Sequence, residues 1–141
     1  VEIYEDLIKY SQNPQITKKL QITICTNLIN AGCCTQALEK LDKLINQSTG
    51  DNPEILREAL LIKAKAYISL GSIEDAIKLI LENEETNNSA KGTFLVGYCC
   101  MLQGEFGKAK TFLNKVIDEF PPSKYNYRSK TYLERIEEMN N

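Results

Sequence analysis

Residues 97–109 read GYCCMLQGEFGKA, in which Gly104 stands five positions before Ala109. A glycine and an alanine with the same separation occur twice more in the chain, as Gly32 with Ala37 and as Gly71 with Ala76. The three glycines lie 39 and 33 residues apart. Self-similarity at such a period is the sequence signature of stacked repeats. The sequence therefore predicts a repeat protein.

Each of these glycines follows one amphipathic stretch and precedes another. The preceding stretches are Leu20–Asn30, Ala59–Leu70 and Gly92–Leu102. A helix that ends through a left-handed residue does so at least cost with glycine. A small alanine soon afterwards lets two helices cross closely. We therefore expect each unit to be a helix, a tight turn and a second helix, and the fold class to be all-α.

These units resemble the tetratricopeptide repeat family, whose pattern combines a small residue, an aromatic residue, the turn glycine, a second small residue, an apolar residue and a closing proline. The third unit matches best, with Gly97, Gly104, Phe106, Ala109, Leu113 and Pro121. The second matches with Ala64, Tyr67, Gly71, Ile73, Ala76 and Ile80, but has Asn83 where a small apolar residue is usual. The first is the most divergent, with Cys25, Leu28, Gly32, Cys34, Ala37 and Leu41. The resemblance implies a right-handed superhelix of antiparallel helical hairpins.

We expect one helical-repeat domain over residues 1–141. Its parts are a preceding helix at 1–12, repeats at 18–50, 57–87 and 90–121, and a capping helix at 123–139. The polar run 47–53 predicts a loop, with Pro53 in the first turn of the next helix behind an Asn or Asp cap. Prolines 121 and 122 with Ser123 are expected to begin the last helix in the same way. Whether repeats precede Val1, and what the 47–52 loop does, stays open.

Composition argues against several classes of protein. The net charge of −2 and the absence of a basic footprint disfavour binding to DNA. No apolar run approaches the eighteen residues of a membrane span, and no secretory signal pattern opens the chain. Five cysteines without a CxxC motif favour buried, reduced thiols and therefore a cytoplasmic protein, with the nucleus as the alternative.

Catalytic and metal-binding patterns are missing from the sequence. There is no histidine, which is the commonest general base and metal ligand. The glycines do not have the spacing of a phosphate-binding loop, and the cysteines do not have that of a zinc site. We therefore expect no enzyme activity, no cofactor and no metal.

The resemblance implies a concave groove lined mainly by the first helix of each unit. The expected partner-binding residues are Lys19, Ile22, Thr26, Leu61, Lys65, Ile68, Lys91, Phe94, Tyr98, Met101, Arg128 and Tyr132. Phe94, Tyr98 and Met101 form the strongest candidate patch, since aromatic residues and methionine are enriched at interface centres. The apolar groove residues could equally pack against neighbouring helices.

Family members that capture Hsp70 or Hsp90 tails hold a terminal carboxylate with a Lys, Asn and Arg clamp. The corresponding positions here are Ile22, Thr26, Ile62, Lys91 and Leu95, of which only Lys91 fits. The predicted function is therefore a non-catalytic adaptor or scaffold that binds a partner helix or apolar peptide within a larger assembly. The alternatives are a module that forms a homodimer through the groove and, less favoured, an RNA-binding helical repeat. The sequence does not identify the partner, the pathway or the organism.

Overall fold

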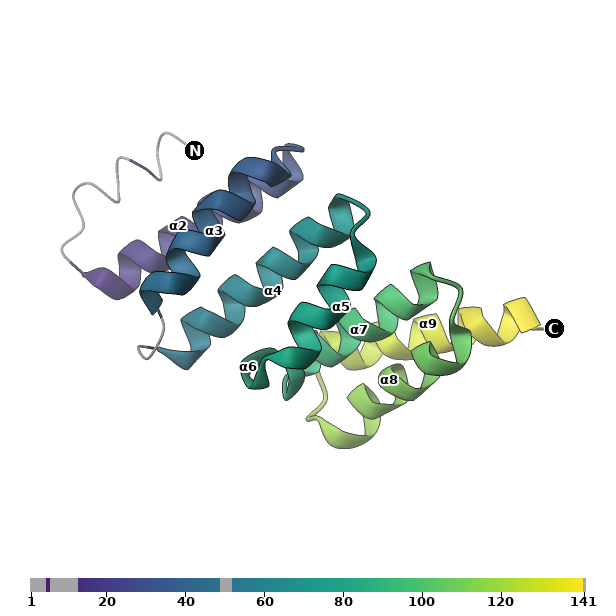
Figure 1. The fold of residues 1–141 in the computed structure, drawn as a ribbon. Helices are drawn as coiled ribbons and strands as arrows, with labels where there is room; N and C mark the ends of the chain where they lie inside the picture. The colour runs from purple at the N-terminus through teal and green to yellow at the C-terminus, as the bar shows by residue number, and fades with distance from the viewer. Residues whose placement is uncertain (1–4, 6–12, 49–51, 141) are drawn as a thin grey trace. The chain divides into compact units, whose positions relative to one another are not determined.

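The computed structural model describes Glu5, residues 13–48 and residues 52–140 (Figure 1). Over these residues the chain forms eight helices and no strand, which confirms the expected all-α fold. The helices are α2 (Pro14–Asn30), α3 (Cys34–Ser48), α4 (Pro53–Ser69), α5 (Ile73–Glu82), α6 (Glu84–Asn87), α7 (Ala90–Leu102), α8 (Phe106–Glu119) and α9 (Lys124–Asn140). Apart from Glu5, the helix predicted over residues 1–12 lies outside the described residues.

The chain forms two compact units, residues 1–72 and residues 73–141, and each is described by itself. In the first unit, helices α2, α3 and α4 all pack against one another. In the second unit, α7 packs against α5, α6, α8 and α9, and α8 also packs against α9. The expectation of one domain with three stacked repeats stays a prediction.

The three predicted glycine turns have the same geometry. Gly32, Gly71 and Gly104 have φ angles of 84°, 81° and 78°, in the left-handed region. In each turn the residue after the glycine donates its backbone N–H to the carbonyl five positions back: Cys33 to Leu28 at 2.7 Å, Ser72 to Tyr67 at 2.8 Å and Glu105 to Cys100 at 2.9 Å. This is the Schellman arrangement, which closes a helix end through a glycine. The predicted role of the three glycines is confirmed.

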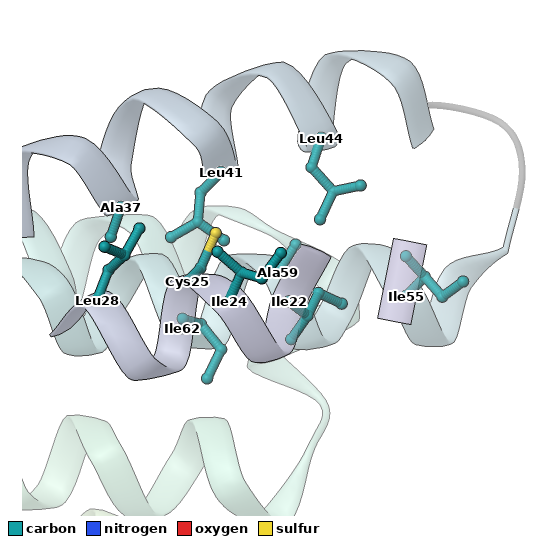
Figure 2. Packing of buried hydrophobic residues seen from close by; sticks show 10 residues of the cluster. All are labelled: Ile22, Ile24, Cys25, Leu28, Ala37, Leu41, Leu44, Ile55, Ala59 and Ile62. Atoms are coloured by element: carbon teal, nitrogen blue, oxygen red, sulfur yellow. The ribbon is translucent and has the colours of Figure 1, made fainter. Parts of the chain in front are cut away.

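The core of the first unit is built from one face of each of its three helices (Figure 2). It contains Ile22, Ile24, Cys25 and Leu28 of α2, Ala37, Leu41 and Leu44 of α3, and Ile55, Ala59 and Ile62 of α4. Three of the small members, Cys25, Ala37 and Ala59, have no exposed surface. Small side chains at these positions allow helix axes to approach closely, as predicted for Ala37.

In the second unit, α7 is the most enclosed helix, and its buried residues run along both sides of its length. Gly97 of α7 lies against α8, because a Cβ atom at this position would come within 2.9 Å of Leu113 Cδ2. Leu113 is itself fully buried, together with Ala109 of α8 and Ile136 of α9. The small residue and the turn glycine of the third predicted repeat therefore serve the close crossing of α7 and α8.

Helix α6 was not predicted, and it joins α5 to α7 through polar side chains. The side chain of Asn83 donates to the Leu79 carbonyl at 2.7 Å, where α5 ends. The buried hydroxyl of Thr86 donates to the Ile80 carbonyl at 2.7 Å. Ser89 donates to the Thr86 carbonyl at 2.8 Å and accepts from the Gly92 N–H at 3.0 Å. We call Asn83, Thr86, Ser89 and Gly92 the polar joint.

Two helix starts differ from expectation and one agrees with it. Pro53 is in the first turn of α4, and Asn52 Oδ1 accepts from the Glu54 N–H at 2.9 Å, as predicted. The prolines expected to begin the last helix lie before it, and its start differs from the predicted residue 123 by one position. Helix α9 begins at Lys124, behind a Ser123 hydroxyl that accepts from the Tyr125 N–H at 3.2 Å. Helix α2 begins at Pro14, earlier than expected, because Asn13 caps it.

Candidate partner-binding site

The groove residues predicted in the first unit differ in exposure. Ile22 belongs to the core cluster (Figure 2), and Leu61 is also buried. Thr26 is half-buried, and its hydroxyl donates to the Ile22 carbonyl at 3.0 Å. Lys19 is exposed, whereas Lys65 and Ile68 are half-buried. Of the six groove residues predicted in this unit, four therefore retain accessible surface, and two of these four are lysines.

The second unit brings several predicted residues together. Phe94 and Tyr98 of α7 stack with their ring centroids 6.5 Å apart and an interplanar angle of 12°. Tyr132 of α9 lies 5.7 Å from Phe94 and 5.8 Å from Tyr98. Tyr125 lies 5.6 Å from Phe94. These separations are typical of attractive ring pairs. We call Phe94, Tyr98, Tyr125 and Tyr132 the aromatic cluster.

The aromatic cluster has a buried member and a partly exposed side. Phe94 is only 6% exposed, so its ring mainly fills space between α7 and α9. Tyr98, Tyr125 and Tyr132 are half-buried and retain accessible surface. The three tyrosines are therefore the members of the cluster that another molecule can contact directly.

Three cations of α9 lie over tyrosine rings of this cluster. Lys124 Nζ is 5.2 Å and Arg128 Cζ 5.7 Å from the centre of the Tyr125 ring. Arg135 Cζ is 5.3 Å from the centre of the Tyr132 ring. Such distances allow a cation–π attraction. We call these three residues the cation rim; all three are exposed, and none forms an ion pair with a described carboxylate.

Arg128, a predicted groove residue, therefore contacts the cluster at the Tyr125 ring. Tyr125 itself was not among the predicted groove residues. Lys91 and Met101 are half-buried on α7. Sequence reasoning also missed Lys124 and Arg135 as candidate site residues. A usable signal was present, because an arginine follows both Tyr125 and Tyr132 by three residues, and residues three apart are neighbours on a helix surface.

Three buried cysteines, Cys25, Cys99 and Cys100, have the chemistry of structural residues. Cys25, Cys34, Cys99 and Cys100 are buried, Cys33 is exposed, and all five are free thiols. Burial raises the pKa of Cys99 to about 12, with a smaller contribution from Cys100, and burial also raises the pKa of Cys25 and Cys100. A nucleophilic thiol requires the opposite shift. No group of His, Cys, Asp and Glu in the described part of the chain could hold a metal ion.

These thiols predict a selective labelling experiment. At pH 8, Ellman's reagent is expected to react quickly with Cys33 of the native protein and with the other cysteines only after unfolding. Rapid reaction of more than one thiol of the native protein would contradict the burial of the other four.

The raised pKa of Cys99 predicts a pH dependence, because the folded chain keeps a proton that the unfolded chain releases. The free energy of unfolding should therefore fall as pH rises from about 9 towards 12.

Among the described residues, no helix has both the length and the apolar character needed to cross a membrane.

In comparisons with known proteins, a family model described as "Tetratricopeptide repeat" matches residues 94–123. This segment contains most of α7, the turn at Gly104 and all of α8. No curated protein and no solved structure matches the chain. Tetratricopeptide repeats are protein–protein interaction modules, and typically non-catalytic ones. The chain is thus all-helical over its described residues, and the family comparison identifies a tetratricopeptide repeat at residues 94–123, within the third predicted repeat.

Proposed function

We propose that this protein is a non-catalytic adaptor that binds a segment of a partner protein on the surface shared by α7 and α9. The observation that carries the proposal is the aromatic cluster with its three half-buried tyrosines. Two members of the cluster, Phe94 and Tyr98, lie on α7, the first helix of the matched repeat and the helix that the resemblance assigns to the groove. The adaptor would hold its partner within a larger assembly.

Tyrosine suits this role for physical reasons. Its ring supplies a large contact area with little loss of side-chain freedom, and its hydroxyl group can satisfy a polar group of the partner. Tyrosine and arginine are also the residue types that dominate binding energy at protein interfaces. Here Tyr98 and Tyr132 pack against Phe94, so their side chains are already restricted in the folded chain. Less side-chain entropy is therefore lost when a partner binds.

The experiment compares affinity capture by three forms of the purified protein. Three proteins are immobilised separately: wild type, a Tyr98→Ala/Tyr132→Ala variant and a Tyr127→Ala control. Proteins that each one retains from a cell extract are identified by mass spectrometry. Tyr127 is a matched control because it is 75% exposed on the same helix and lies about 200° around the helix from Tyr125. A partner retained by wild type and the control, and lost with the double variant, is the expected result.

Two further measurements make the outcome decisive. Circular dichroism must show that the double variant remains helical, because its rings also pack against Phe94. Sedimentation equilibrium at micromolar concentration tests the homodimer alternative, since self-association would double the mass. Identical captures by all three folded proteins would overturn the proposed surface.

A further inference from the structure

We propose that the partner segment carries acidic side chains next to an apolar or aromatic side chain, and that the cation rim receives the carboxylates. This inference rests on the proposed function and defines the chemistry of its partner. It starts from Lys124, Arg128 and Arg135, which lie on cluster rings and have no carboxylate partner among the described residues.

The charged side chains are distributed unevenly around α9. At about 100° per residue, Lys124, Arg128 and Arg135 fall on one side of the helix, next to the tyrosines of the cluster. Among the exposed carboxylates of this helix, Glu137 falls on the opposite side and Glu134 about 100° away from Arg135, whereas Glu138 lies about 60° from Arg135 without forming an ion pair with it. None of the three cations is held in an ion pair by a described carboxylate of its own helix, and the side of α9 that borders the cluster rings is predominantly positive.

The order of charges along α9 opposes the stability of the helix. No acidic residue lies in the first turn and no basic residue lies in the last turn. Instead, Lys124 begins the helix and the glutamates follow near its end, the reverse of what the helix dipole favours. The helix dipole therefore does not explain Lys124 and Arg128 near this end, whereas recognition of an anion would.

The geometry suits side-chain carboxylates in particular. A guanidinium held over a ring face still offers N–H donors around its edge, and arginine binds carboxylates with two parallel hydrogen bonds. The adjacent tyrosine rings offer an apolar surface to a neighbouring side chain of the partner. A nucleic acid would also be anionic, but the chain has a net charge of −2 and its glutamates share α9 with the cation rim.

The test uses two synthetic helical peptides with the same leucine and phenylalanine positions. One has glutamate and the other glutamine at the remaining positions, and both are amidated so that no terminal carboxylate contributes. Fluorescence anisotropy measures their binding to wild type, Arg128→Gln, Arg135→Gln and Lys130→Gln. Lys130 is the matched control because it is an exposed cation on the same helix, on the side opposite the rim.

The glutamate peptide is expected to bind wild type about tenfold more tightly than the glutamine peptide, with the difference lost at 0.5 M salt. Either arginine substitution should weaken glutamate-peptide binding up to about fivefold, as expected for an exposed ion pair, while Lys130→Gln leaves it unchanged. The glutamine peptide should not distinguish these variants.

Each other outcome overturns the inference in a recognisable way. If both peptides bind equally, and both are lost with Tyr98→Ala/Tyr132→Ala, the surface binds protein segments without needing acidic groups, and the proposed function survives. If neither peptide binds, the inference fails, and the capture experiment decides the proposed function separately. If single-stranded oligouridylate displaces the glutamate peptide and depends on the same arginines, the surface belongs to a nucleic acid.

Discussion

Replacing Phe94 by alanine is expected to destabilise the second unit by about 3–5 kcal/mol, the usual cost of truncating a buried phenylalanine. Phe94 is 6% exposed and lies 5.6–6.5 Å from three tyrosine rings of α7 and α9. Alanine would leave a cavity between these helices, because the packed rings can only partly collapse into it. Thermal unfolding followed by circular dichroism should show a drop of roughly 10 °C or more.

Two controls separate packing from a role at the surface. Phe94→Leu should lose clearly less stability than Phe94→Ala because it refills part of the volume. Tyr127→Ala, at a position 75% exposed, should remain within about 0.5 kcal/mol of wild type. If Phe94→Ala melts at the wild-type temperature, Phe94 does not hold α7 and α9 together. Its predicted place in a partner-binding groove would then become the better explanation.

Replacing Gly92 by alanine is expected to destabilise the second unit by about 3 kcal/mol, a loss similar to that for Phe94→Ala. The cause is the opposite one, because the substitution adds an atom where there is no room instead of leaving a cavity. A Cβ atom at this position would overlap the backbone carbonyl oxygen of Thr86 and lie 2.8 Å from Ser89 Oγ. Backbone atoms cannot turn aside as a flexible side chain can, so the polar joint would have to shift. The hydrogen bond from the Gly92 N–H to Ser89 would be disturbed as well. Chemical denaturation gives the free energy directly.

Gly107→Ala is the matched comparison, since a Cβ atom at Gly107 meets nothing within 4 Å and the residue is already helical. Alanine there should stabilise the protein by about 0.5 kcal/mol, because it restricts the unfolded chain more than glycine does. The same substitution at two helical glycines of one unit should thus change stability in opposite directions. Equal effects at Gly92 and Gly107 would mean that the polar joint tolerates the added methyl group.

The glycine turns could be predicted from sequence because they depend on local chemistry. A left-handed residue at a helix end favours glycine whatever surrounds it, so Gly32, Gly71 and Gly104 marked three helix ends correctly. The cap at Asn52 was predictable for the same reason. The start of α9 was predicted to within one residue, and the Ser123 side chain caps the helix that begins at Lys124.

The polar joint was not predicted, although its hydrogen bonds join residues at most six positions apart. Asn83 was recognised as a departure from the repeat pattern, but the burial of Thr86 depends on how α5, α6 and α7 pack together. Hydrophobic periodicity identifies helices of several turns, whereas α6 has only one turn and therefore shows no period.

The candidate site was predicted in part. Family positions selected Phe94, Tyr98 and Tyr132, which the structure places in ring contact. The same positions selected Ile22 and Leu61, which are buried, because an apolar residue on a helix serves a core as readily as a groove. Lys124 and Arg135 were missed because charged residues on a helix usually form a solvated face. Their contacts with tyrosine rings and their place on the cluster side of α9 distinguish these two from Lys130.

The shared geometry of the three glycine turns bears on how this chain folds during synthesis. Each turn is closed by bonds between residues at most five positions apart, as between Glu105 and Cys100, so none depends on sequence made later. Contacts of such short range carry a small loop-closure cost and form early. At the pace of translation, a helix and its turn have ample time to form before the next segment leaves the ribosome. We therefore expect the order of synthesis to be compatible with the order of folding, with each new segment packing onto an end that is already closed.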